Sequence, residues 1–195
     1  MTLSISARCP ESGQLGIAIS SSSMAVGSRC PWLLPGVGAV ASQNITLPSL
    51  GPQILSALEA GASVEQALNL ALAEDRFREY RQVAAIDANG DTAVFSGEFT
   101  LGIGGALAGD NCVAAGNMLA GPGAPAAMGG AVAISNIFTI AVSRRRSSNW
   151  PTMLFATTGR SCRMRRISTC YGSVTLSCVP RRLSPAGKPW ALPMG

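Results

Sequence analysis

Two alternating segments at the start of the chain constrain its fold more than any other feature. From Leu3 to Arg8 apolar residues alternate with polar ones, and residues 14–20 alternate in the same way. A period of two predicts half-buried strands, and residues 10–13 (PESG) between them have the composition of a tight turn. The chain is therefore expected to open with a β-hairpin that holds residue 2 at the start of its first strand.

The rest of the first 130 residues predicts an α+β fold. The capping pair Ser63 and Gln66 and the helical spacing of apolar residues predict two helices, and Asn89-Gly90 predicts a second hairpin. In chain order we expect a loop over residues 20–36 with Met24, Val26 and Trp32 buried, a strand over 37–43, helices over 54–58 and 64–72, and strands over 81–87, 92–96 and 112–118. Strands on both sides of a helical pair indicate a layered α+β domain rather than a doubly wound sheet.

Charge divides the chain into two unequal parts. Residues 1–143 hold all ten acidic residues and five arginines, whereas residues 144–195 hold nine arginines, one lysine and no acidic residue. We interpret residues 1–130 as the folded domain and residues 131–195 as a basic tail that is frame-shifted or disordered. A shifted reading frame explains the excess of arginine, serine, proline and cysteine. An arm that binds nucleic acid is the weaker explanation, because no base-reading or stacking motif accompanies the charge.

The second residue carries a recognised catalytic device. Met1 is followed by Thr2, so removal of Met1 would place a free α-amine and a hydroxyl on one residue. Such an amine can act as the general base for its own hydroxyl, and no histidine is then needed. The chain has no histidine. The position alone is a weak signal, since a strand that follows Met-Thr needs no catalytic role.

Several other kinds of protein and site are not indicated. The first residues lack the basic and apolar segments of a signal peptide, and no apolar stretch is long enough to span a membrane. We therefore expect a cytoplasmic protein with reduced cysteines and no membrane partner. The spacing of Cys162, Cys170 and Cys178 matches no zinc pattern. We expect no metal and no cofactor.

Four blocks of sequence, in the same order, resemble one family. The opening TLSISARCPESGQLGIAIS is similar to T-F-S-I-V-A-R-D-P-x-T-G-x-L-G-V-A-V-A-S, the opening of a bacterial and archaeal domain-of-unknown-function family, ten-twenty-eight. The similarity covers residues 2 to about 128 and continues through AVGSRCPWLLPGVGAVASQNITLPSLGPQILSALEAGASVEQAL, REYRQVAAIDANGDTAVFSGE and AAGNMLAGP.

The family is grouped with the N-terminal nucleophile (Ntn) hydrolases, so the resemblance implies an αββα sandwich. The tail does not resemble the helix and last strand that the family would supply next. We therefore expect the sandwich to be incomplete at its C-terminus, with an unpaired sheet edge.

The resemblance also implies a set of site residues. Thr2 is the nucleophile and base, Ser4 lies on the same strand face and supports it, and Asn117 donates its amide to an oxyanion. Residues implied to bind the substrate, with Arg29 holding an anionic group, are Arg8, Ser20, Ser21, Ser22 and Arg29. Structural roles stay open: Ser4 as a polar face residue, Arg8 as a surface charge and Asn117 as a turn residue.

The activity implied by the resemblance is that of an Ntn-type amidohydrolase acting on a small-molecule or peptide amide through an acyl-enzyme. Some family members carry a peptidoglycan-binding domain, which favours cell-wall amides. The only lysine, Lys188, lies in the basic tail, whereas better-known Ntn hydrolases place a lysine or another polar group beside the nucleophile. The alternative is a non-catalytic binding or assembly protein on the same fold, and the abundant glycine and alanine favour a homo-oligomer.

Overall fold

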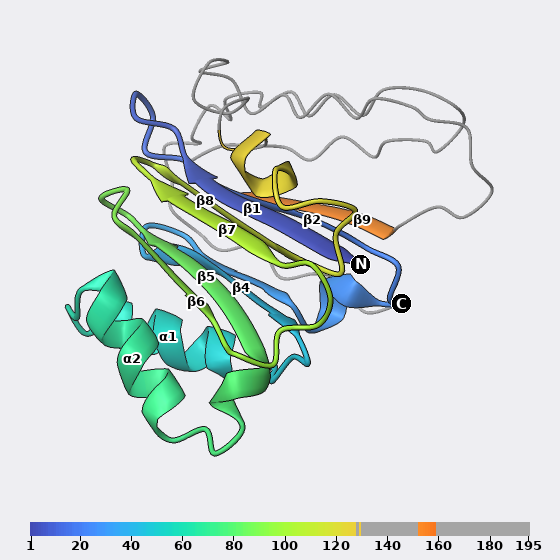
Figure 1. The fold of residues 1–195 in the computed structure, drawn as a ribbon. Coiled ribbons are helices and arrows are strands. Elements are labelled where there is room, and N and C mark those ends of the chain that lie inside the picture. Colours follow the sequence, from blue (N-terminus) through green and yellow to red (C-terminus); the bar gives the residue numbers. More distant parts are fainter. Residues whose placement is uncertain (128, 130–151, 159–195) are drawn as a thin grey trace, which may run out of the picture.

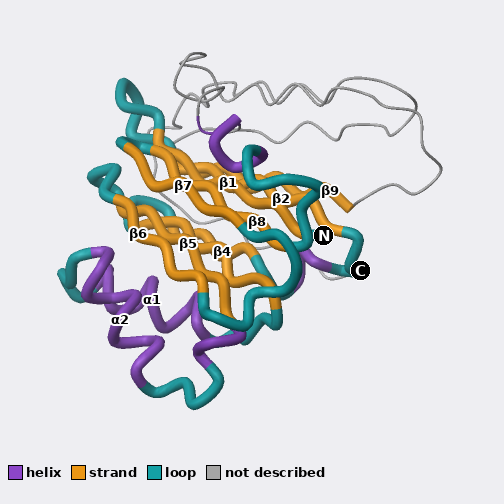
Figure 2. Tube along the Cα trace, in the orientation of Figure 1, coloured by secondary structure: helices purple, strands orange, loops and turns teal. Residues whose placement is uncertain are grey.

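Two antiparallel sheets face each other, and a pair of helices covers the outer face of one of them (Figures 1 and 2). The computed structural model describes residues 1–127, 129 and 152–158. The first sheet has the strand order β7-β8-β1-β2-β9, and the second has the order β3-β4-β5-β6. The strands are β1 (Thr2–Arg8), β2 (Leu15–Ser21), β3 (Pro31–Leu34), β4 (Gly38–Asn44), β5 (Arg81–Asp87), β6 (Thr92–Ser96), β7 (Gly105–Gly109), β8 (Cys112–Asn117) and β9 (Thr152–Thr158).

The opening hairpin forms the centre of the first sheet. β1 pairs with β2 on one side and with β8 on the other, and its residues alternate between the two faces of the sheet. Buried side chains that join the two sheets are Leu15, Val113 and Ala115 from the first sheet and Ala39, Ala84 and Ile86 from the second. Ser4 pairs with Ala115 in β8. Thr2 and Ser4 therefore lie on the face that packs against the second sheet.

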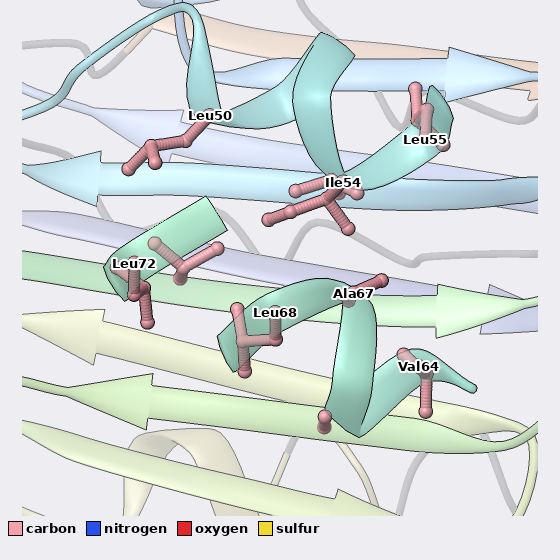
Figure 3. Close-up of a cluster of buried hydrophobic side chains, with 11 residues drawn as sticks. Leu50, Ile54, Leu55, Val64, Ala67, Leu68 and Leu72 are labelled. Atoms are coloured by element: carbon pink, nitrogen blue, oxygen red, sulfur yellow. The ribbon is translucent and has the colours of Figure 1, made fainter. Parts of the chain in front are cut away.

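The helices α1 (Leu50–Glu59) and α2 (Val64–Ala73) cover the second sheet with one apolar face each. Figure 3 shows the buried helical side chains, which are Leu50, Ile54, Leu55, Val64, Ala67, Leu68 and Leu72. The predicted capping box of α2 is confirmed: the Gln66 backbone N–H donates to Ser63 Oγ at 3.2 Å, and the Ser63 N–H donates to Gln66 Oε1 at 3.1 Å. Within the described residues, no helix has the length and hydropathy needed to cross a bilayer.

Ile54 and Leu70 provide a matched test of this helical layer. Ile54 is completely buried against the second sheet, whereas Leu70 on α2 keeps 63% of its surface exposed. We expect Ile54→Ala to lower the free energy of unfolding by about 3 kcal/mol, because truncation removes buried methyl groups and leaves a cavity. Leu70→Ala should change it by no more than about 0.5 kcal/mol. Urea unfolding measures both variants, and equal losses would contradict this packing.

A buried ion pair ties the segment after α2 to the start of β5. Arg81 Nε lies 2.6 Å from Asp75 Oδ2, and the two side chains are 8% and 5% exposed. Arg81 Nη1 also donates to the Ile45 carbonyl oxygen at 2.5 Å. Hydrogen bonds from Arg81 lower the pKa of Asp75, against the opposing effect of burial.

This ion pair predicts a loss of stability in acid. Folding lowers the pKa of Asp75. The stabilisation that the Asp75 carboxylate gives to the fold is therefore complete above its unfolded-state pKa of about 3.9. It is lost as pH falls through the lower pKa of the folded state. Asp75→Asn should lower the free energy of unfolding by about 3 kcal/mol at pH 7 and flatten its decrease below pH 4. Thermal unfolding against pH measures this, with the exposed Asp110→Asn as control. An unchanged acid profile in Asp75→Asn would contradict the assignment.

The loop expected over residues 20–36 holds more structure than its composition predicts. Val26–Ser28 form a 3₁₀ turn and Pro31–Leu34 form β3. The expectation for Met24 is wrong, because 85% of its surface is exposed, whereas Val26 is buried and Trp32 is half-buried against the helical layer. The segment contains two prolines and several serines and glycines, which predict a loop. It nevertheless includes a strand of four residues. β7 is not predicted for the same reason, because the glycines in and around it are typical of loops.

β9 lies inside the basic tail, where the sequence predicts no regular element. Its backbone pairs with β2 from Leu15↔Thr158 to Ser21↔Thr152. The expectation of an unpaired edge is therefore wrong at β2. The run TMLFATT (152–158) contains strand-forming residues without polar alternation, so periodicity does not reveal it. The other expectations for residues 131–195 are a shifted frame, disorder or a nucleic-acid-binding arm. Apart from β9, the residues that they concern lie outside the described part of the chain.

Candidate active site

Thr2 occupies one end of the first sheet, between two polar cross-strand partners. It pairs with Ser21 of β2 on one side and with Asn117 of β8 on the other. Thr2 Oγ1 and Ser21 Oγ are 2.9 Å apart and hydrogen-bonded. Only 8% of the Thr2 surface is exposed, and Ser21 and Asn117 are fully buried. The register of two strand pairs thus brings three residues from distant parts of the chain to one point.

The carbonyl group of Met1 is held beside Thr2 by donors from the end of β2. Its oxygen accepts hydrogen bonds from the Ser22 backbone N–H at 3.1 Å, from Ser21 Oγ at 3.3 Å and from Ser22 Oγ at 3.4 Å. The Met1 ammonium group donates to Ser22 Oγ at 3.0 Å. The bond between Met1 and Thr2 therefore lies in a polar environment built by Ser21 and Ser22.

Three buried amide side chains connect the Thr2 end of the first sheet to the second sheet. Gln82 of β5 donates through Nε2 to the Gly116 carbonyl oxygen at 3.0 Å. Its Oε1 accepts from Gln43 Nε2 at 2.8 Å and from Asn117 Nδ2 at 3.1 Å. We call Gln43, Gln82 and Asn117 the amide cluster.

The backbone fixes the orientation of every amide in this cluster. A carbonyl oxygen can only accept, so Gly116 requires the Nε2 side of Gln82. Gln82 Oε1 then faces Gln43 and Asn117, which must both present their NH₂ groups. Their remaining oxygens, Gln43 Oε1 and Asn117 Oδ1, are buried and have no hydrogen-bond partner within the described residues. The atom of Asn117 without a partner is therefore an acceptor, and one of the two NH₂ protons is bound to Gln82 Oε1. The role of Asn117 as the donor to an oxyanion stays a prediction.

Ser4 lies on the same face as Thr2, as predicted, and is completely buried. Its hydroxyl donates to the Ala115 carbonyl oxygen at 3.4 Å. This contact joins β1 to β8 and gives Ser4 a structural role.

Two residues predicted to bind the substrate lie away from Thr2. Arg8 is at the other end of β1, about 20 Å along the strand, where Nε donates to the Ala88 carbonyl oxygen at 2.7 Å and Nη1 to Asn111 Oδ1 at 3.2 Å. Ser20 pairs with Leu3, one position out of phase with Thr2, so it lies on the opposite face of the sheet. The structure places neither residue at this site.

Arg29 is connected to the site through the segment that follows β2. Its guanidinium donates to Ser23 Oγ and to the Met24 carbonyl oxygen, the latter at 3.1 Å. The Ser23 backbone N–H in turn donates to Ser21 Oγ at 3.0 Å. Arg29 is therefore near enough to hold the loop that positions Ser21, and these two hydrogen bonds are made to the protein itself.

The sequence-based prediction missed Gln43 and Gln82. Gln43 shares a face of β4 with the buried Ala39 and Ala41, and Gln82 shares a face of β5 with the buried Ala84 and Ile86. A polar residue on the same strand face as buried apolar residues could have indicated these two glutamines. A buried amide needs hydrogen-bond partners, so it points to a polar cluster.

Comparison with known proteins identifies the family. The profile of a family of unknown function, DUF1028, matches residues 2–138. The chain belongs to the DUF1028 family. The match extends ten residues beyond residue 128, where the resemblance quoted from the sequence ends.

A solved structure gives the same family assignment. The crystal structure of protein SPO2555 from Silicibacter pomeroyi, described as DUF1028, is similar to this DUF1028 chain with 33% sequence identity and a TM-score of 0.67. The similarity covers 70% of this chain and 61% of SPO2555, so the chain spans less than two thirds of that protein. No match was found among curated proteins.

Proposed function

We propose that this DUF1028 protein is an Ntn-type amidohydrolase whose nucleophile is Thr2 after loss of Met1. The observation that carries the proposal is the position of the Thr2 hydroxyl. It lies at the first residue of a central strand, next to a carbonyl group that several donors hold. The layer order of helices, sheet and sheet among the described residues supports the αββα arrangement that goes with this activity.

The chemistry needs no residue beyond Thr2 to move the proton. The free α-amine takes the hydroxyl proton while Oγ1 attacks the amide carbonyl carbon. The carbon–nitrogen bond then breaks, and the leaving amine receives that proton. Water, deprotonated by the same amine, hydrolyses the ester on Oγ1 and releases a carboxylic acid. Cell-wall peptides are the substrates that the family resemblance favours.

The unpartnered oxygen of Asn117 supports this role for the amine. Asn117 is the direct cross-strand partner of Thr2, so their side chains begin about 5 Å apart. Its Oδ1 is buried without a donor among the described residues. A free amine on Thr2 supplies N–H groups at this end of the sheet, and one of them can satisfy this acceptor. We therefore assign Asn117 to orienting the amine.

Acylation by a small β-lactone tests the proposal without knowledge of the substrate. A hydroxyl nucleophile opens the strained ring and keeps the acyl group as an ester. Trypsin releases residues 2–8 as the peptide TLSISAR, in which fragmentation distinguishes Thr2 from Ser4 and Ser6. We expect a single acyl group on Thr2 in protein that lacks Met1. No acylation, or acylation only elsewhere, would overturn the proposal.

A second candidate, a non-catalytic assembly protein, is favoured by one surface feature. Large apolar side chains lie exposed beside the end of β8: Tyr80, Phe99, Leu101, Ile103 and Met118. The Met118 N–H donates to the Leu101 carbonyl oxygen at 2.9 Å, and the Tyr80 and Phe99 ring centroids are 5.0 Å apart. Exposed apolar patches often mark protein contacts. Sedimentation of the wild type and of Leu101→Ser would show whether this surface joins copies of the chain.

A further inference from the structure

The groups that donate hydrogen bonds to the Met1 carbonyl form a binding position for a carbonyl oxygen. This position lies beside Thr2, the proposed nucleophile. The carbon of this group is bonded to the Thr2 nitrogen, only four covalent bonds from Oγ1. Its oxygen accepts from the Ser22 N–H, Ser21 Oγ and Ser22 Oγ. Three donors around one oxygen, next to a hydroxyl, are the arrangement that stabilises an oxyanion during acyl transfer.

The hydroxyl of Ser21 is oriented by its own partners. A serine hydroxyl has one proton and two acceptor positions. Ser21 Oγ accepts from the Ser23 backbone N–H at 3.0 Å and is bonded to Thr2 Oγ1 at 2.9 Å. When Thr2 is the donor in the second bond, both acceptor positions are filled. The single proton of Ser21 is then directed to the carbonyl oxygen, 3.3 Å away.

Loss of Met1 would leave these donors without their acceptor. The Ser22 N–H continues the ladder between β1 and β2 by one residue, and its acceptor is the Met1 carbonyl. After Met1 is removed, the strand begins at Thr2 and offers no carbonyl at that position. The Ser22 N–H and the Ser21 hydroxyl stay in place because β2 is held between β1 and β9. The position is thus set by a central strand of the sheet.

We propose that the Ser22 N–H and the Ser21 hydroxyl bind the substrate carbonyl oxygen and then the oxyanion formed when Thr2 attacks. The Met1 carbonyl occupies this position before processing. The inference rests on the proposed function, and it moves the oxyanion contact from Asn117 to the end of β2. The substrate is accordingly an acyl compound whose carbonyl oxygen enters where the Met1 oxygen lies.

Two pairs of variants of the full chain test the proposal through the rate of β-lactone acylation at Thr2. Ser22→Pro removes the backbone donor, whereas Ser22→Ala retains it. Ser21→Ala removes the hydroxyl donor, and its control Ser20→Ala changes the neighbouring serine on the opposite face. We expect Ser22→Pro and Ser21→Ala each to lower the rate by about 10²-fold. Ser22→Ala loses only the Ser22 Oγ contact at 3.4 Å, so it should slow the reaction by less than Ser22→Pro does. The control Ser20→Ala should react at close to the wild-type rate.

The outcomes separate this inference from the proposed function. If wild-type Thr2 is acylated and both Ser22→Pro and Ser21→Ala react as fast as the wild type, the oxyanion assignment is overturned while the nucleophile stands. If wild-type Thr2 is not acylated, both proposals fall. Circular dichroism checks that each variant is folded. Should Ser22→Pro fail to fold, the comparison of Ser21→Ala with Ser20→Ala decides the outcome.

Discussion

Thr2→Ala is expected to lower the rate of β-lactone acylation by at least about 10³-fold, because it removes the hydroxyl oxygen that attacks the lactone carbonyl. Among the described residues, the hydroxyl of Thr2 has one hydrogen-bond partner, Ser21 Oγ. Its loss should therefore cost only about 1 kcal/mol of the free energy of unfolding. The variant should be folded and inactive, a combination that a purely structural role for Thr2 would not produce.

Thr2→Ser is the matched control for this prediction. Serine retains both the hydroxyl and, after loss of Met1, the α-amine, so the variant should keep measurable acylation at residue 2. A second control, Ser4→Ala, changes the buried serine next along the same face, whose hydroxyl donates to the Ala115 carbonyl oxygen. It should react at close to the wild-type rate. Acylation of Thr2→Ala at the wild-type rate would remove Thr2 from the mechanism.

Gln82→Leu is expected to cause the largest loss of stability, about 4–5 kcal/mol. Gln82 is completely buried, and its side chain satisfies the Gly116 carbonyl oxygen and the NH₂ groups of Gln43 and Asn117. Leucine fills a similar volume but removes the hydrogen bonds to these three groups, at about 1.5 kcal/mol each. The expected loss of stability comes from these lost hydrogen bonds, because leucine leaves no large cavity.

Gln53→Leu is the control for this stability prediction, because Gln53 lies exposed on α1. The same chemical change there should shift the free energy of unfolding by no more than about 0.5 kcal/mol. Urea unfolding of the two variants gives the comparison. A loss below about 1 kcal/mol in Gln82→Leu would mean that the amide cluster does not hold the sheets together as described.

Local patterns explain how much of the fold the sequence predicts. β5 and β6 follow the predicted bounds because an Asn-Gly turn fixes their register, and α2 begins at Val64 because Ser63 caps it. β7 and β9 are missed because glycines and the lack of alternation remove the periodic signal. Local sequence determines local structure, but a strand stabilised by its neighbours need not carry the pattern itself.

The site is only partly predictable for a related reason. Alternation places Thr2 and Ser4 on one face, yet it also places Arg8 there, at the far end of the strand. Two residues on the same face of a strand belong to one site only if they are also close together along the strand. The meeting of Thr2 with Ser21 and Asn117 depends on the register of two strand pairs, which sequence spacing does not give.

The intact mass of the soluble protein shows whether Thr2 can be the nucleophile, because the mechanism requires a free amine on Thr2. We expect a mass lower than that of the full 195-residue chain by one methionine residue, with Thr2 as the first residue on Edman degradation. A mass that retains Met1 would leave the Met1 carbonyl in the position proposed for the substrate and remove the base. That result would contradict the nucleophile assignment and favour the assembly protein.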